Sequence, residues 1–369
     1  MNKKTFIIIG SSIIGVIIVI LLILWLLTVI KGHYTTYEKV EDKMIDATKS
    51  YYKTYPEKLP SKNGKSTLSY ETLVESKKIK PLNELLKDGD TCKAEIEVIK
   101  NDNNYDYMPR LTCSDKYSTK TLVDQILSNN DIVNQGSGLY KYNDEYYFKG
   151  KINNNYVSFG TSASSDKNIL WQIISIDKNN NIKMRSIEKT ERSFFDTRYN
   201  IDKDTNFGYN TLENSEFSDY LKSLEEKELF LKKGFETKLV KTKLCTNKRS
   251  IYDKSKDGST ECASLSNDSY LYSTLLPYEF LRASLDTNCI DAESRSCSNL
   301  NFLTEYSSSS TWTITPDANT SYKLFVYDLS GLALTNASNE KSIYPVVLLS
   351  QFAQFKSGDG TLNNPYIVK

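Results

Sequence analysis

The segment from Asp253 to Glu261 holds the residues whose types and spacing most directly suggest chemistry. Oxygen-bearing side chains stand at its first, third, fifth and ninth positions, which are Asp253, Ser255, Asp257 and Glu261. Glycine stands at the sixth position, and calcium-binding loops combine several oxygen ligands with such a tight turn. The twelfth position carries Ser264 in place of the glutamate that binds calcium through both carboxylate oxygens. The segment is therefore a calcium candidate, and a polar turn tied down by a disulfide at Cys262 is the alternative.

Histidine occurs once, at His33, and its position excludes much of enzyme chemistry. A Ser-His-Asp triad, a Cys-His pair and a histidine-based zinc site each need an imidazole inside the folded domain. His33 instead follows directly after a long apolar run. The carboxylate pairs Asp202/Asp204 and Glu225/Glu226 lack the apolar surroundings that a glycosidase acid needs. We therefore expect a protein that is not an enzyme and that has no cofactor apart from the calcium candidate.

The charges of the chain are nearly balanced, with 47 lysine and arginine residues against 46 aspartate and glutamate residues. Proteins that bind nucleic acid or anionic surfaces electrostatically carry an excess of basic residues. No nucleic-acid partner is therefore expected.

Six cysteines fall into three pairs of near neighbours along the chain. We predict the disulfides Cys92–Cys113, Cys245–Cys262 and Cys289–Cys297. The sequence has no Cys-x-x-Cys motif, and the scarcity of histidine further disfavours metal binding. Disulfides persist in oxidising compartments, so this pairing favours an extracellular location. Free buried thiols at apolar positions are the alternative.

Hairpin geometry supports the first of these pairs. The segment Cys92–Lys100 alternates like a half-buried strand, and Tyr105–Cys113 can return after the turn-rich residues 101–104. If Asp102 and Asn103 form a two-residue loop, the residue numbers of cross-strand partners add up to 205. The numbers of Cys92 and Cys113 do so, which places the two cysteines opposite each other, within reach of a disulfide.

An apolar run near the N-terminus extends from Thr5 to Ile30, 26 residues without a charge. At about 1.5 Å per residue, a helix of this length crosses the roughly 30 Å hydrocarbon core of a membrane. A cleaved signal peptide, the alternative, has an apolar core of only about 7–15 residues. Because Lys3 and Lys4 precede the run, we predict that residues 1–33 form a cytoplasmic tail and one transmembrane helix, with the remainder of the chain extracellular.

The residues after the apolar run are predicted to form a small α+β unit at 34–125. Apolar residues from Tyr34 to Tyr52 recur near a period of 3.6, so the membrane helix is expected to continue as an amphipathic stalk until Tyr55–Pro56. Ser69 is suited to cap a short helix that runs to about Lys77. Turn-rich residues around 131–138 then predict a linker at 126–137.

Strands dominate the predicted second domain, 138–369. Ile169–Ile176 and Ile182–Ile187 flank a loop of Asp and Asn residues and predict a hairpin. A helical patch is expected at about 215–231. Closing strands are predicted at 312–315, 323–327 and 344–349, with Pro345 at an edge or a strand start. The predicted fold class is therefore α+β, with a mostly β C-terminal domain.

Aromatic side chains in this second domain have two interpretations. Together on a surface they form a flat platform for sugars, whereas on alternating strands they more often belong to the core. The residues concerned are Tyr146, Tyr147, Tyr156, Trp171, Tyr270, Tyr272, Trp312 and Tyr366. Trp171 and Trp312 lie in apolar strands, so both are expected in the core.

The N-terminal part has a recognisable order of features. An apolar helix that extends into a stalk, the pair Tyr51–Tyr52, the segment Leu59–Pro60, a short helix and a hairpin follow one another. This order resembles type IV pilin-like and pseudopilin-like proteins of Gram-positive bacteria. Pilins also carry a glycine before a cleavage point and a glutamate early in the mature helix. After Gly10 this chain has only Ser-Ser-Ile-Ile-Gly, so the resemblance implies the architecture without the processing signal.

A series of short motifs occurs in order along the C-terminal part. They include Gly138-Leu-Tyr-Lys, Tyr147-Phe-Lys-Gly, Trp171-Gln-Ile-Ile, Pro277-Tyr-Glu-Phe, Trp312-Thr-Ile-Thr-Pro, Tyr344-Pro-Val-Val-Leu and Ser357-Gly-Asp-Gly. This series resembles an uncharacterised surface-protein domain of low-GC Gram-positive bacteria, which is distantly similar to C-type-lectin-like domains. That family has no established catalytic residues, so the resemblance implies no catalytic site.

Taken together, these features predict a membrane-anchored extracellular binding or adhesion protein, with a lectin-like domain on a pilin-like unit. The resemblance implies a glycan or an envelope protein as its partner. A minor component of a pilus-like or type II secretion-like assembly is the alternative function.

Overall fold

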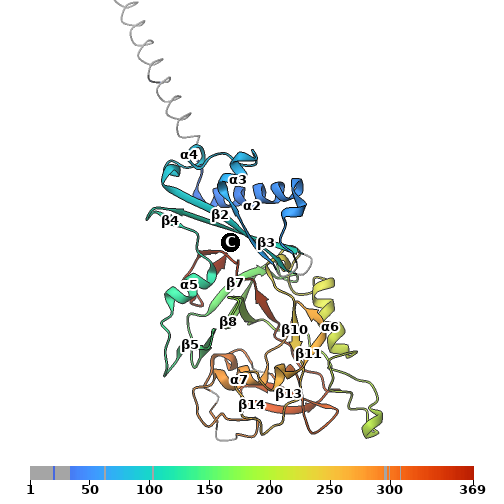
Figure 1. Cartoon of the computed structure of the whole chain (residues 1–369). Helices are drawn as coiled ribbons and strands as arrows, with labels where there is room; N and C mark the ends of the chain where they lie inside the picture. Colours follow the sequence, from blue (N-terminus) through green and yellow to red (C-terminus); the bar gives the residue numbers. More distant parts are fainter. Residues whose placement is uncertain are drawn as a thin grey trace, which may run out of the picture. The chain divides into compact units, whose positions relative to one another are not determined.

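The computed structural model describes residues 34–61, 64–101, 104–294, 297–298, 300–307 and 309–369, and in addition Ile20. The chain divides into two compact units, Met1–Thr119 and Lys120–Lys369 (Figure 1). Both contain helices and antiparallel strands, so the α+β fold class is confirmed. The apolar run Thr5–Ile30 lies outside the described residues except for Ile20. Within the described part of the chain, no helix combines the length and apolarity needed to cross a membrane.

The first unit is built from helix α2 and a four-stranded antiparallel sheet. Helix α2 (Tyr37–Thr54) begins at the N-cap Thr36, whose side chain accepts a hydrogen bond from the backbone of Lys39, and it ends before Pro56. Its buried side chains include Val40, Met44, Tyr51 and Tyr52, which belong to the same core as Ile96, Val98 and Leu111 of the sheet. Apolar burial therefore holds α2 against the strands.

The prediction of one continuous stalk helix through Tyr34 is wrong. Thr36 has an extended backbone with φ −83° and ψ 160°, and residues 34–36 are not helical. The backbone N–H of Thr35 donates instead to the carbonyl of Leu85. Helix α2 is thus a separate helix that packs within the first unit.

The sheet of the first unit has the strand order β1-β2-β3-β4. Its strands are β1 (Lys65–Ser69), β2 (Cys92–Asn101), β3 (Asn104–Cys113) and β4 (Tyr117–Ser118). Two short helices, α3 (Tyr70–Glu75) and α4 (Leu82–Leu85), connect β1 to β2, and Ser69 caps α3 as predicted. The hairpin β2–β3 pairs Cys92 with Cys113 and Asn101 with Asn104, so the predicted register and the disulfide are both confirmed.

Loss of the Cys92–Cys113 disulfide is expected to destabilise the first unit by about 3 kcal/mol. The bridge closes a loop with a sequence separation of 21, and the chain-entropy relation gives this magnitude for such a loop. Urea unfolding of the full-length protein in a non-ionic detergent, followed by hydrogen exchange of the β2 and β3 amides, measures the effect in Cys92→Ser/Cys113→Ser. The matched control replaces the neighbouring exposed pair in Lys93→Ser/Thr112→Ser. Equal unfolding midpoints for the two double variants would contradict the prediction.

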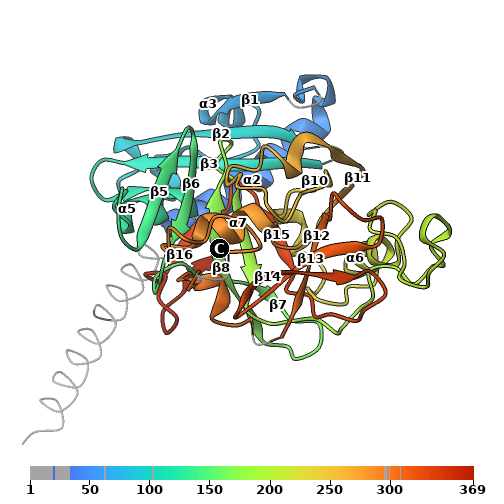
Figure 2. The ribbon, with the colours of Figure 1, turned by 90° about the horizontal axis from the view of Figure 1, so that it is seen from below.

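The second unit is organised around an eight-stranded sheet (Figure 2). Six of its strands follow the order β15-β9-β8-β7-β17-β16. The other two join through β8, because β6 pairs with β8 and β5 pairs with β6. The strands are β5 (Gly138–Tyr142), β6 (Glu145–Lys149), β7 (Tyr156–Thr161), β8 (Asn168–Ile176), β9 (Ile182–Ser186), β15 (Val346–Leu349), β16 (Phe355–Ser357) and β17 (Tyr366–Val368). All pairs are antiparallel except β17 with β7, and the predicted hairpin of β8 with β9 is confirmed.

Further elements complete the second unit. The helices are α5 (Leu122–Asn129), α6 (Glu216–Glu226) and α7 (Pro277–Ala283). The remaining strands are β10 (Thr242–Cys245) with β11 (Leu265–Tyr270), and β12 (Thr311–Pro316), β13 (Lys323–Asp328) and β14 (Gly331–Asn336). The expected helix at 215–231 is therefore shorter, while the closing strands β12, β13 and β15 match their predicted positions; β15 starts directly after Pro345.

The boundary between the units lies earlier than the predicted linker at 126–137. It falls between Thr119 and Lys120, and α5 belongs to the second unit. Leu122, Val123 and Ile126 of α5 are buried in the core of that unit. The burial of this apolar helix face thus assigns the residues of α5 to the second unit. The sequence alone had placed them in the first unit and in the linker.

Candidate functional site

A row of polar side chains lies on one face of the large sheet. On β9, Lys183 and Arg185 alternate with Ile182, Met184 and Ser186, so both point to the same face. Lys183 is paired with Ser175 of β8, Arg185 is paired with Gln172 of β8, and Ser175 is paired with Tyr147 of β6. Since cross-strand partners share a face, the pleat gathers these five polar residues on one side of the sheet.

Helix α7 places a buried carboxylate over this row. Pro277 is its first residue, and Glu279 stands at the third position, where one carboxylate oxygen accepts a hydrogen bond from the backbone of Leu276 at 2.9 Å. The other carboxylate oxygen of Glu279 forms an ion pair with the Lys183 ammonium. The Glu279 side chain is fully buried, and that of Lys183 is 21% exposed. A cation on the sheet is thus bound to a carboxylate on the helix, which joins α7 to β9.

A second ion pair joins the other end of α7 to β6. The guanidinium of Arg282 donates to both carboxylate oxygens of Glu145, at 3.0 and 3.1 Å. The same guanidinium lies 4.3 Å from the ring centre of Tyr147 and 5.3 Å from that of Tyr278. Such a two-pronged pair with ring stacking fixes the orientation of the guanidinium.

A pocket of about 300 Å³ lies between the sheet, α7 and the β10–β11 ribbon. This volume is at the lower end of the range for small-molecule sites. Its apolar lining includes Leu271, Ile314 and Val347. The polar residues of its lining are Glu145, Ser175, Asp177, Lys183, Thr242, Lys243, Ser273, Tyr278 and Glu279. Burial, together with the neighbouring Glu279 carboxylate, raises the pKa of Tyr278 well above its usual range, so its hydroxyl stays protonated.

Two carboxylates of the pocket lining are held in ion pairs. The carboxylate of Glu279 is committed to Lys183, and that of Glu145 to Arg282. Asp177 and Lys243 also line the pocket, so its lining carries charges of both signs and offers both hydrogen-bond donors and acceptors. The sequence prediction missed these residues, although the alternation of Lys183 and Arg185 in a strand between apolar strands was a signal for them.

Arg185 does not line the pocket and is fully buried. Its guanidinium donates to the carbonyl of Leu303 at 2.7 Å, to Ser307 at 3.1 Å and to the side-chain oxygen of Gln172 at 2.8 Å. No described carboxylate lies within ion-pair distance of it. Hydrogen bonds to neutral acceptors thus hold this charge, and they tie the segment 303–307 to strand β9.

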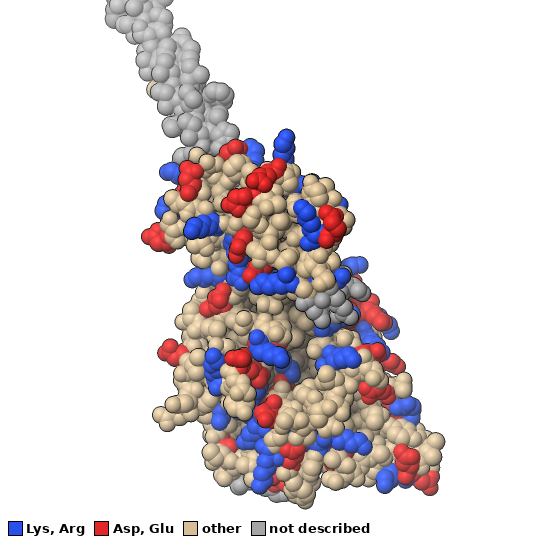
Figure 3. All heavy atoms as spheres, in the orientation of Figure 1, with Lys and Arg blue, Asp and Glu red and all other residues tan. Residues whose placement is uncertain are grey.

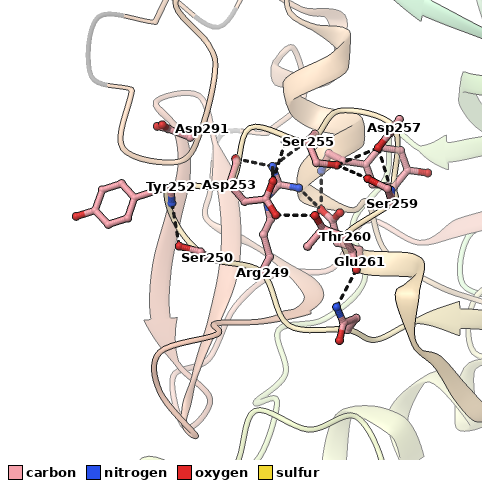
Figure 4. A network of polar contacts seen from close by, with 12 residues as sticks. Arg249, Ser250, Tyr252, Asp253, Ser255, Asp257, Ser259, Thr260, Glu261 and Asp291 are labelled. Carbon is pink, nitrogen blue, oxygen red and sulfur yellow. Dashed lines mark hydrogen bonds and ion pairs between the residues drawn. The ribbon is translucent and has the colours of Figure 1, made fainter.

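The calcium candidate has a different role in the structure, shown in Figure 4. The guanidinium of Arg249 donates to Glu261 at 2.7 Å and to the backbone carbonyls of Asp253 and Ser255 at 2.8 and 2.9 Å. The carboxylate of Asp253 accepts hydrogen bonds from the Ser255 backbone and from Thr260. The side chain of Ser255 donates to Asp257.

The calcium hypothesis is therefore corrected. Asp253, Ser255, Asp257 and Glu261 do not converge as one set of ligands, because the buried carboxylate of Glu261 pairs with an arginine and the others close the loop among themselves. The internal cation Arg249 organises this segment. Among the described residues, only Asp286, Cys289 and Cys297 group like metal ligands, and these two cysteines form a disulfide.

Asp257 makes the stability of this loop pH-dependent. Hydrogen bonds from the hydroxyl and backbone of Ser259 and from the Ser255 hydroxyl lower the pKa of Asp257 from 3.8 to about 2. Its contribution to stability is thus fully present above pH ~4 and is lost as the pH falls through about 2. The melting-temperature difference between the native protein and Asp257→Asn should therefore shrink over this pH range in a thermal scan. The control Asp202→Asn changes an exposed position. Its melting-temperature difference from the native protein should not shrink in the same way over this pH range.

The other two predicted disulfides, Cys245–Cys262 and Cys289–Cys297, are present as well. Cys245 also lines the pocket, and Cys262 directly follows Glu261. The first of these bridges therefore links the pocket wall to the loop that surrounds Arg249.

Of the two interpretations of the aromatic residues, the structure favours the core, and the expected burial of Trp171 and Trp312 is confirmed. Six of the eight residues are buried, namely Tyr156, Trp171, Tyr270, Tyr272, Trp312 and Tyr366, and all of these except Tyr156 belong to the main apolar core. Trp171 donates through its indole N–H to the carbonyl of Phe159 at 2.8 Å. Only Tyr146 and Tyr147, on β6, remain partly exposed.

Comparison of the chain with protein-family models, curated proteins and solved structures found no match.

Proposed function

We propose that this chain is a membrane-anchored extracellular protein whose second unit binds a ligand without transforming it. Three observations support this proposal: the uncharged run Thr5–Ile30, the three disulfides, and the pocket beside α7. Disulfides in each unit are typical of proteins exposed to an oxidising environment. The lectin-like and pilin-like interpretations of the two units belong to the same proposal.

The pocket carries the proposal about the ligand. Its paired charges, the Tyr278 hydroxyl and an apolar wall suit an uncharged saccharide, whose hydroxyls both donate and accept hydrogen bonds. One face of the second unit agrees with an uncharged ligand. On the face shown in Figure 3, basic and acidic side chains are interspersed over the second unit.

A glycan array probed with the full-length protein in a non-ionic detergent tests this function. The variant Ser273→Trp fills the pocket with a large side chain, and the matched variant Ser164→Trp adds the same side chain at an exposed turn. We expect saccharide binding by the native protein and by Ser164→Trp, and its loss in Ser273→Trp. Background signal for all glycans, or equal binding by the two variants, would refute the pocket as a saccharide site.

A second candidate function is a role as a minor subunit of a pilus-like or type II secretion-like assembly. An open groove of about 600 Å³ in the first unit favours it. Ala47, Val74 and Ile79 contribute apolar surface to this groove, and Lys43 and Lys77 contribute positive charge. An acidic segment of a partner subunit would complement this lining.

Co-purification after crosslinking of whole cells tests this second function. Charge reversal in Lys43→Glu/Lys77→Glu should abolish capture of an envelope complex, while Lys203→Glu, an exposed change in the second unit, should not. Capture that is equal for both variants, or absent for the native protein, counts against the assembly role.

A further inference from the structure

The hairpin β5–β6 carries tyrosines on the side of the sheet that bears the pocket. Its register pairs Tyr140 with Tyr147 and Tyr142 with Glu145, so all four side chains share one face. Tyr147 is also paired with Ser175 of β8, which lines the pocket, and Glu145 lines the pocket itself. The aromatic face of the hairpin is therefore continuous with the pocket wall.

The inner rings of this face are held in place. The ring of Tyr147 lies 4.3 Å from the guanidinium of Arg282, and the ring of Tyr140 stacks on it at 5.7 Å and 22°. The ammonium of Lys149 lies 5.3 Å from the ring centre of Tyr140, whose hydroxyl donates to the carbonyl of Gly136. Alternating rings and cations thus order this surface before any ligand arrives, which lowers the entropic cost of binding.

Tyr142 lies at the outer end of the same face, next to the tight turn at Asn143, which has φ 52°. The side chain opposite to it across the hairpin is Glu145, at the edge of the pocket. Tyr142 is 53% exposed, in contrast to the buried aromatic residues of the core. An exposed ring presents an electron-rich face to the C–H groups on one side of a sugar.

We propose that Tyr142 forms a second subsite, which binds the sugar unit next to the one held in the pocket. The ligand is then an uncharged oligosaccharide rather than a monosaccharide. This inference rests on the proposed saccharide binding and adds the class and orientation of the ligand: its chain runs from the pocket, past Glu145, onto the hairpin.

Calorimetric titration of the full-length protein in detergent tests the subsite with N-acetylglucosamine oligomers and glucose oligomers of graded length. For the native protein, affinity should rise from the monosaccharide to the disaccharide. Tyr142→Ala should lower the affinity for the disaccharide about three- to tenfold, the range of one aromatic contact, and leave monosaccharide affinity nearly unchanged. Tyr142→Phe should bind like the native protein because it keeps the ring. Tyr199→Ala, which removes another exposed tyrosine outside the hairpin, should have no effect.

Two other outcomes separate failure of this inference from failure of the proposed function. Monosaccharide binding with no gain from chain length, or an equal loss for both ligand lengths in Tyr142→Ala, overturns the subsite and leaves the pocket intact. The absence of binding for every oligomer overturns both.

Discussion

Arg249→Met is expected to lower the free energy of unfolding of the second unit by about 3–5 kcal/mol, the usual effect of removing one partner from a buried ion pair. The Arg249 side chain is 1% exposed and that of Glu261 is fully buried, so no water can replace the guanidinium. The change also removes the hydrogen bonds to the carbonyls of Asp253 and Ser255. A buried charge and two backbone acceptors would lose their partner at the same time.

The effect should extend to the pocket. Glu261 accepts a hydrogen bond from the backbone of Tyr278 at 3.0 Å, so the same carboxylate that binds Arg249 also holds the start of α7. Helix α7 carries Glu279, which lines the pocket. We therefore expect Arg249→Met to increase hydrogen exchange of the α7 amides as well as those of residues 249–262.

Urea unfolding of the full-length protein in detergent measures this prediction. The matched control is Arg192→Met, because Arg192 forms an exposed pair with Glu340 at 3.7 Å, and such surface pairs contribute about 0–1 kcal/mol. The double variant Arg249→Met/Glu261→Gln should recover part of the loss, since it removes the unpaired charge. Similar midpoints for Arg249→Met and Arg192→Met would show that the buried pair is not needed for the fold.

Lys183→Met should cost about 3 kcal/mol of stability and should also abolish ligand binding in the pocket. The side chain of Glu279 is fully buried, and Lys183 is its ion-pair partner, so the change leaves a carboxylate without a cation inside the protein. Methionine keeps the length of the apolar stem but offers no hydrogen-bond donor to the carboxylate or to a ligand.

A double-mutant cycle separates these two effects. Lys183→Met/Glu279→Gln removes both charges, and the glutamine amide oxygen can still accept the hydrogen bond from Leu276. Stability should therefore largely return in the double variant, while saccharide affinity should not. The control Lys222→Met breaks the exposed pair with Asp268 and should change stability by less than about 1 kcal/mol. Additive losses in the cycle would mean that Lys183 and Glu279 do not act as a pair.

Local features of the chain were well predicted from the sequence. Cys92 and Cys113 face each other because the pairing of Asn101 with Asn104 sets the register of every later pair in the hairpin. Ser69 caps α3 and Pro345 precedes β15, since these residues act on their immediate backbone neighbours. In each case the deciding interaction spans few residues, so the sequence pattern contains the necessary information.

The candidate site could not be predicted in the same way. Lys183 and Glu279 are 96 positions apart, and Glu145 and Arg282 are 137 apart. The strands that carry Lys183 and Glu145 were predicted from the sequence, but helix α7, which carries Glu279 and Arg282, and its docking over β9 were not. The calcium candidate failed for a similar reason: Arg249 lies just outside the segment, and only the folded loop shows that its guanidinium occupies the centre.

The sequence by itself determined the three disulfides and the register of the first hairpin. It also determined two features of composition: a single histidine and an uncharged run long enough to span a membrane. Only the tertiary structure decided which charges meet. Burial makes an unpaired charge expensive, so Lys183, Glu279, Arg249 and Glu261 must find partners where the packing of sheet, helix and loops brings them together. That packing depends on the whole apolar core of the unit, and it turns scattered charged residues into a lined pocket with an aromatic face beside it.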